Sequence, residues 1–204
     1  MTCGAIGPVL FMITFFIDGA TRPGYEPWRN LVSQLSTGER GWVQIANFEL
    51  CGALLLVGTS GLLRIRASRV VTLLLGVLAV GLIAAGVFAT DPGFGYPPGE
   101  REPTQPTFHD MVHGVVSVIV FFTLSVLPVV VALQARSSRH WAWYSLLSGV
   151  AALVFITAAA LVAAEQQRIV TPDAPMGVLQ RISVVAGFAW LAAFFIRLRA
   201  VNTQ

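Results

Sequence analysis

Two histidines four residues apart are the most specific chemical feature of the sequence. In the stretch PTFHDMVHGVV, His109 and His113 would share one face of a helix, which is the geometry by which two imidazoles reach one zinc ion. Asp110 stands where zinc proteases carry a glutamate, one carbon shorter, which weakens a protease interpretation. A zinc site needs a third protein ligand, and no spacing selects one. The alternative is that both imidazoles form hydrogen bonds near a helix start. Zinc or another divalent metal at His109 and His113 is therefore a hypothesis.

Ionisable residues inside apolar segments are the second chemical signal. Glu49 lies about two turns inside an apolar run, where a charge costs a few kcal/mol and usually faces the protein interior with a partner. Arg181, Asp91 and His113 are predicted at a similar depth on other segments. They would form either a structural salt-bridge network or a functional pocket. For acid–base chemistry, the catalytic candidates are Glu49, Asp91 and His113.

The segments that position these residues read as membrane helices. The 204-residue chain is 55% hydrophobic and only 11% charged, whereas soluble domains carry about 25% charged residues. Six apolar runs approach the ~20 residues that cross a bilayer as a helix. We predict an all-α bundle of six transmembrane helices in one domain, residues 1–204. The spans are expected at about 3–17, 43–63, 70–90, 111–133, 141–164 and 178–196.

The distribution of arginine predicts the orientation. Seven arginines and no acidic residue lie on one side of the predicted membrane, in the connections after the second and fourth spans and in the C-terminal tail: Arg64, Arg66, Arg69, Arg136, Arg139, Arg197 and Arg199. Short arginine-rich loops stay cytoplasmic, so both termini are predicted in the cytoplasm. This explains the net charge of +3 without nucleic acid, and it indicates a multi-pass protein of the plasma membrane.

The three predicted extracytoplasmic loops carry the unusual sequence. In the first, Trp28, Leu31, Val32 and Leu35 recur at helical spacing, which predicts a short amphipathic helix, Trp28–Ser36, at the membrane surface or folded over the bundle. The second is rich in proline and glycine and is predicted to be irregular. Together they would roof a polar pocket in the outer leaflet. Its predicted residues are Arg29, Ser33, Glu49, Asp91, His109, His113 and Arg181.

These motifs resemble one family. YEPWRNLVSQLSTGERG, FATDPGFGYPPG followed by TFHDMVHG, and LQRISVVAGFAW occur in the order typical of bacterial and archaeal membrane proteins of domain-of-unknown-function family 998. The resemblance extends over most of the chain and implies a fold and a topology, but no activity. The matching positions are Trp28, Ser33, Asp91, Pro92, Tyr96, Pro97, Pro98, His109, His113, Gly114 and Arg181. Residue 110 varies in the family pattern, which further weakens Asp110 as a catalytic base.

Three functions are consistent with the sequence. The first is binding of a lipid or small amphiphile in the outer-leaflet pocket. The second is an enzyme that acts on a lipophilic substrate by acid–base or metal-assisted chemistry. The third is a secondary transporter, which the sequence disfavours because the inner halves of the spans contain almost no ionisable residue. The bilayer is the expected environment, and Gly76, Gly81 and Gly86 permit the close helix packing of a homo-oligomer without indicating one.

Overall fold

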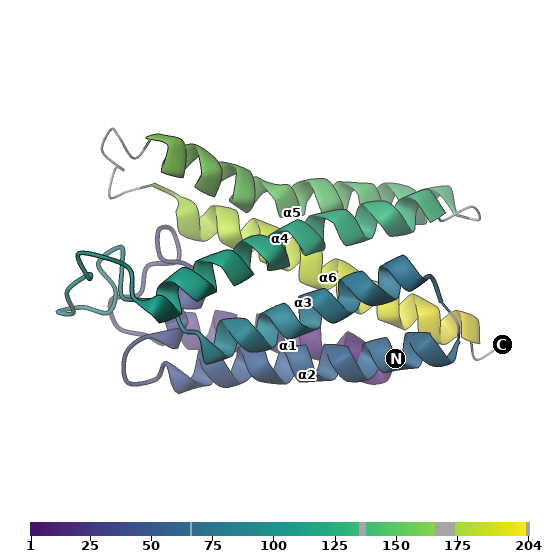
Figure 1. Cartoon of the computed structure of the whole chain (residues 1–204), viewed down its shortest axis with the longest axis horizontal. Coiled ribbons are helices and arrows are strands. Elements are labelled where there is room, and N and C mark those ends of the chain that lie inside the picture. The colour runs from purple at the N-terminus through teal and green to yellow at the C-terminus, as the bar shows by residue number, and fades with distance from the viewer. Residues whose placement is uncertain (66, 135–137, 166–173, 203–204) are drawn as a thin grey trace.

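The computed structural model describes residues 1–65, 67–134, 138–165 and 174–202, and these residues form a helical bundle without strands (Figure 1). One short 3₁₀ helix, η1, lies between the first two long helices. The elements in chain order are α1 (Thr2–Ala20), η1 (Val32–Ser36), α2 (Trp42–Arg64), α3 (Arg69–Val87), α4 (Phe108–Gln134), α5 (Arg139–Glu165) and α6 (Met176–Asn202).

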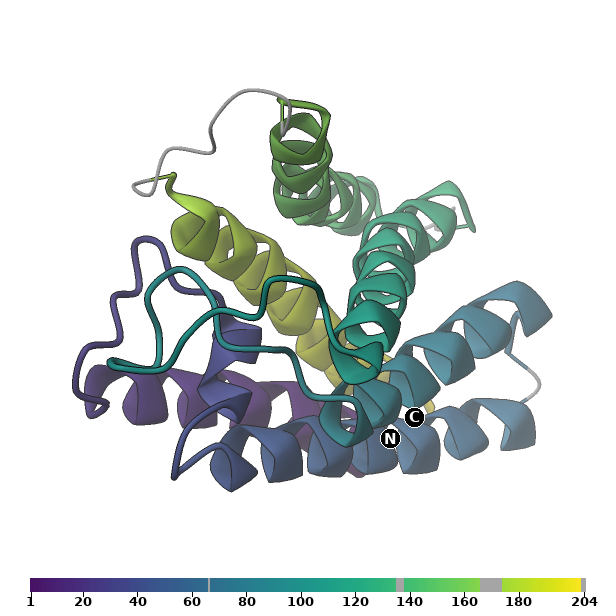
Figure 2. The same ribbon diagram turned by 60° about the vertical axis from the view of Figure 1, so that its left-hand side comes forward.

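The long helices form a ring in which each helix packs against the next helix in sequence and α6 closes the ring on α1 (Figure 2). Short connections join α2 to α3 and α4 to α5 at one end of the bundle. The first long loop, between α1 and α2 (residues 21–41), and the second long loop, between α3 and α4 (residues 88–107), lie at the other end. The two chain ends lie near each other, since Arg199 Nη1 in the last turns of α6 donates to Thr2 Oγ1 at 3.4 Å. The arginine-rich connections and both termini therefore occupy the same end of the bundle.

Among the described residues, five helices are long and apolar enough to cross a membrane: α1, α2, α3, α4 and α6. The predicted span starts and ends are close to those of the helices, but α1 continues to Ala20 and α6 to Asn202, well past the predicted ends at 17 and 196. Helices extend beyond the apolar segment because backbone hydrogen bonding does not stop where hydrophobicity does. The opposite holds for α3, which ends at Val87, before the predicted 90, as the chain turns toward Asp91-Pro92.

The helix predicted at Trp28–Ser36 is wrong in extent, and of its two predicted environments the structure shows the one folded over the bundle. Residues 27–30 form a turn, Leu31 is extended with ψ near 152°, and only Val32–Ser36 is helical. All five residues of η1 are buried against the bundle, while Trp28 is 59% exposed. The helix begins late because the Gln34 side-chain oxygen accepts from Leu31 N at 2.8 Å, which fixes Leu31 outside the helix.

Candidate functional site

The buried imidazole of His113 marks a candidate site at the end of the bundle with the long loops. His113 lies in the second turn of α4 and is 5% exposed. Its Nδ1 lies 2.7 Å from Phe88 O and 3.2 Å from Ala85 O at the end of α3. Since carbonyl oxygens only accept, Nδ1 carries the proton in these bonds, and in a neutral ring Nε2 is left as an acceptor. The imidazole therefore ties α4 to α3 with one nitrogen and retains the other for a further contact.

A small cavity lies beside His113. It has a volume of about 30 Å³, and its polar lining consists of His113, Ser117 on α4, Ser33 on η1 and Gln180 on α6. The rest of the lining is apolar and includes the aromatic side chains of Phe11, Phe48, Phe121 and Phe188. This volume leaves room for little more than a water molecule or a hydroxyl-sized group.

A larger hollow lies on the other side of η1. It has a volume of about 350 Å³ and is lined by Leu31 and Gln34, by the second long loop, including Asp91 and Glu102, and by Asp110 in the first turn of α4. The neighbouring residues Val32 and Ser33 line the small cavity instead. The first turn of η1 therefore separates a hollow lined by carboxylates from a cavity lined by aromatic side chains.

The first turn of η1 is thus a wall between the hollow and the cavity, and two hydrogen bonds hold it in place. Gln180 Oε1 on α6 accepts from Val32 N at 2.6 Å. Gln34 Nε2 donates to Gly93 O in the second long loop. Gln180 also lines the small cavity, so a molecule that entered the cavity and bound the Gln180 amide would compete with the bond that fixes η1.

Asp91 and Asp110 join the end of α3 to the start of α4. The two carboxylate oxygens of Asp91 accept from Thr107 N and Thr107 Oγ1, both at 2.8 Å, just before α4 begins. Asp110 Oδ1 accepts from Thr90 Oγ1 at 2.7 Å and from Asp91 N at 3.1 Å. This reciprocal arrangement satisfies backbone donors and explains why residue types with short acceptor side chains stand here.

Arg181 connects α6 to the first long loop. Its Nη1 donates to Pro27 O at 2.7 Å and Asn30 O at 2.9 Å, and its Nη2 donates to the Tyr25 hydroxyl. That hydroxyl in turn donates to Leu31 O at 2.9 Å. Burial raises the pKa of Tyr25 to about 12, although the neighbouring Arg181 opposes the increase. The phenol therefore keeps its proton and its donor role at neutral pH.

A second network, centred on Asp18 and Arg22, anchors the same loop. Asp18 is 3% exposed and accepts from Arg22 Nη2 at 2.7 Å and from Arg40 Nη2 at 2.5 Å. Arg22 also donates to Leu35 O at 2.7 Å and to the Tyr96 hydroxyl at 3.2 Å. Burial lowers the pKa of Arg22, but the hydrogen bonds to Asp18 and Tyr96 outweigh it and the pKa lies above its ordinary value. The first and second long loops are thus held to α1 by a buried, permanently charged group.

The structure brings only part of the predicted pocket together. Ser33 and His113 line the small cavity and Asp91 lines the hollow, whereas Arg29 pairs with Glu26 at 3.2 Å at the surface. Arg181 is occupied by the first loop, as described above.

The prediction that Glu49 faces the protein interior is wrong. Glu49 is exposed, and its side chain lies over Gly86 in the last turn of α3. Because α3 ends one residue later, at Val87, Glu49 sits level with a helix end, where an exposed carboxylate costs less than it does deep in hydrocarbon. Glu49 and Arg181 are not ion-paired in the part of the chain that the structure describes.

The two histidines of the candidate metal pair lie in different environments. His109 is exposed and packs edge-on against Phe88, with ring centroids 5.5 Å apart, while His113 is buried. Within the described residues, no group of three or more His, Cys, Asp or Glu side chains is placed to hold a metal ion.

Sequence reasoning missed Gln180 and the network around Arg22. Gln180 opens the last helix beside Arg181, and its polarity next to an apolar run was the available signal. Asp18 and Arg22 are four residues apart, the spacing of an ion pair on a helix, although the helix itself ends between them. Gln180 binds Val32 N, and Arg22 also binds Leu35 O and the Tyr96 hydroxyl; these partners are distant in sequence, so no local pattern reveals them.

An all-helical bundle with several helices able to cross a bilayer defines the class of the protein: it is a multi-pass integral membrane protein. Comparison with known families places it more closely. Residues 5–197 match the family described as "Protein of unknown function (DUF998)", and the chain belongs to this family. Comparisons with curated proteins and with solved structures gave no match.

Proposed function

We propose that the protein crosses the plasma membrane six times, with both termini in the cytoplasm, and binds a small amphiphile at the extracytoplasmic end of the bundle. The arginines support this topology, because arginine-rich connections stay in the cytoplasm. The end of the bundle that carries both termini also carries Arg64, Arg69, Arg139 and Arg199. The five helices that meet the criteria for a span and the 27-residue α5 supply the six crossings.

Cysteine labelling tests the topology. In a variant with Cys3→Ser and Cys51→Ala, single cysteines are introduced at Glu100 in the second long loop or at His140 at the start of α5, both exposed positions. A membrane-impermeant maleimide added to intact cells is expected to label Glu100→Cys and to label His140→Cys only after lysis. The reverse pattern would show the opposite orientation, and labelling of both in intact cells would show an even number of crossings between them, which contradicts a single crossing by α4.

The wall formed by η1 is the observation that carries the binding proposal. It separates a carboxylate-lined hollow from an aromatic cavity, which are the two environments that the two ends of an amphiphile require. Ionised carboxylates only accept hydrogen bonds, so the polar end is expected to be a donor such as an amine. Because the cavity holds only about 30 Å³, the apolar chain enters when the first turn of η1 moves aside. The Gln180 bond to Val32 N is the contact that would break.

The positions of the acidic residues also bear on the alternative that the protein is an enzyme. Asp91 uses both oxygens on Thr107, and Glu49 is exposed on another face, so neither stands beside His113 as a proton-transfer partner. Binding is therefore the better-supported function of this site.

Thermal unfolding in detergent with added dodecylamine tests the binding proposal, with dodecyl sulfate as the matched anionic probe. Glu102→Gln removes an exposed carboxylate from the hollow, and Glu100→Gln is its control in the same loop outside the hollow. Ser117→Leu fills the small cavity.

Dodecylamine is expected to raise the unfolding temperature of the wild type and of Glu100→Gln, and to raise it less for Glu102→Gln and for Ser117→Leu. Equal shifts with the two probes, or equal shifts in Glu102→Gln and Glu100→Gln, would refute the site.

A further inference from the structure

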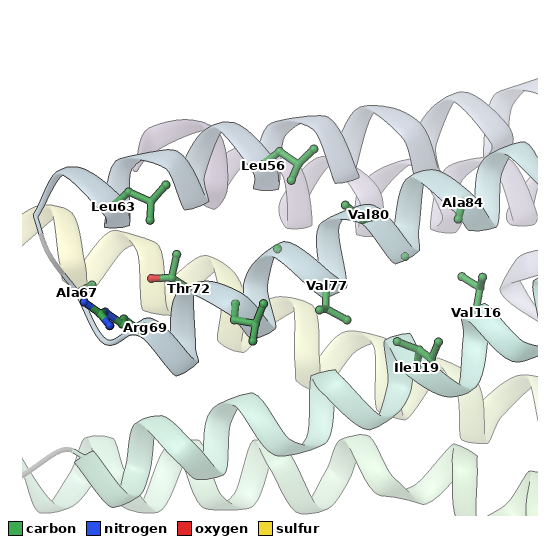
Figure 3. Close-up of a pocket in the computed structure, with 13 residues that line it drawn as sticks. Leu56, Leu63, Ala67, Arg69, Thr72, Val77, Val80, Ala84, Val116 and Ile119 are labelled. Atoms are coloured by element: carbon green, nitrogen blue, oxygen red, sulfur yellow. The ribbon is translucent and has the colours of Figure 1, made fainter.

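A long apolar groove runs along α3 on the outside of the bundle (Figure 3). It has a volume of about 1270 Å³, its floor is α3 and its sides come from Leu56 and Leu63 of α2 and from Val116 and Ile119 of α4. The α3 residues that line it are Arg69, Thr72, Leu73, Gly76, Val77, Val80, Gly81 and Ala84, which recur every three or four positions. One continuous face of α3 is thus left without a protein partner over most of the helix.

The groove is long enough to hold one lipid chain. From Arg69 to Ala84 the floor is about 22 Å long at 1.5 Å per residue, and half of a bilayer core is about 15 Å. Near the middle of the groove the space is open at Gly76, where a side chain would meet no atom within 4 Å. A single acyl chain of the nearer leaflet can therefore lie in the groove over the whole length of the chain.

Charge is confined to one end of the groove. Arg69 lies at the start of α3 and is exposed, close to Ala67 at the end of the groove in Figure 3. The ion pairs within the described residues involve only Asp18 and Glu26, so Arg69 has no carboxylate partner there. Among the residues that the structure describes, the acidic ones all lie toward the other end of the bundle or in the loops there. The positive charge of Arg69 could therefore be balanced only by an anion from outside this part of the chain.

We propose that the groove is a binding site for an anionic phospholipid of the leaflet at the arginine-rich end, with its phosphate at Arg69 and one acyl chain along α3. This site lies at the opposite end from the amphiphile site and does not depend on it. A second copy of the chain is a poorer occupant, because two copies inserted in the same orientation would bring their Arg69 side chains to the same depth, and like charges repel.

Native mass spectrometry of protein purified from nanodiscs tests the proposal. The nanodiscs contain equal amounts of phosphatidylglycerol and phosphatidylcholine with the same acyl chains, so only the head-group charge differs. Arg69→Gln removes the charge, with Arg139→Gln at the exposed start of α5 as its control. Gly76→Leu fills the groove, with Gly114→Leu as its control, since both glycines have open space around them but Gly114 lies outside the groove.

The wild type is expected to retain one phosphatidylglycerol in preference to phosphatidylcholine by about fivefold, the effect of one arginine at an anionic surface. The preference should disappear in Arg69→Gln, retention of either lipid should fall in Gly76→Leu, and both control variants should behave as the wild type. Each variant is first shown to have the unfolding temperature of the wild type.

Three results would overturn the proposal. The first is equal retention of the two lipids by the wild type. The second is undiminished retention by a well-folded Gly76→Leu variant. The third is a dimer that Gly76→Leu converts to a monomer, which would assign the groove to a second copy of the chain.

Discussion

Replacing Arg22 by leucine is expected to destabilise the protein more than any other single arginine substitution described above. The Arg22 side chain is 4% exposed and that of Asp18 is 3% exposed, so the substitution leaves a buried carboxylate without its main partner. Breaking a buried ion pair in this way costs about 3–5 kcal/mol. Arg40, at 2.5 Å from Asp18, remains as a second partner, which favours the lower end of that range, about 3 kcal/mol.

Thermal unfolding in detergent, followed by tryptophan fluorescence, measures the effect. For a chain of this size about 3 kcal/mol lowers the midpoint by roughly 6–12 °C. Arg29→Leu is the control, because Arg29 pairs with an exposed Glu26 and such pairs contribute at most about 1 kcal/mol. A double variant, Asp18→Leu with Arg22→Leu, removes both charges and should recover part of the loss. If Arg22→Leu costs no more than Arg29→Leu, or if the double variant is worse than the single one, the buried network is not what stabilises this end.

Other substitutions test separate parts of the description. Gly177→Ala should lower the unfolding temperature strongly, since its Cβ would lie within 2.5 Å of backbone oxygen atoms, whereas Gly114→Ala has open space and should be neutral or stabilising by up to about 1 kcal/mol. Tyr25→Phe should be less stable than the wild type at pH 9, and the difference in stability should narrow toward pH 12. The pKa of Tyr25 is raised in the folded protein, so its phenol stabilises the fold below pH 10, and this contribution is lost between about pH 10 and 12. A constant difference would refute this assignment. Metal content measured by mass spectrometry should be equal in the wild type and in His109→Ala/His113→Ala, because one imidazole is exposed, the other is buried, and no third ligand is placed beside them among the described residues. Stoichiometric metal that is lost in the variant would establish the pair as ligands.

The sequence predicted the helices better than the site, for a physical reason. Hydrophobic runs of membrane length are a local property, so the all-α class and the approximate positions of the helices could be read directly. The site depends on which way each side chain faces and on contacts across the bundle. Ser33 and His113, two residues of the predicted pocket, do line one cavity, and both stood out in the sequence as polar residues beside apolar ones.

Glu49 shows where such reasoning fails. The cost of a charge in hydrocarbon predicts an inward orientation only for a residue deep in the membrane. The depth of Glu49 was judged from its position along α2 alone. The neighbouring helix ends at Val87, so the local environment is that of a helix end. Likewise, the length of the helix in the first loop was decided by one extended residue, Leu31, which the apolar periodicity does not detect.

The ring arrangement has a consequence for how the chain assembles. Each helix from α2 to α5 packs against the helix made just before it, so these contacts can form as the chain is inserted. Contacts of α1 with α6, and those of the first long loop with Gln180 and Arg181, must wait until the last helix is synthesised. The wall between hollow and cavity is therefore completed last. A chain truncated before α6 would expose an unfinished loop and an uncovered face of α1, both of which membrane quality-control proteases could recognise.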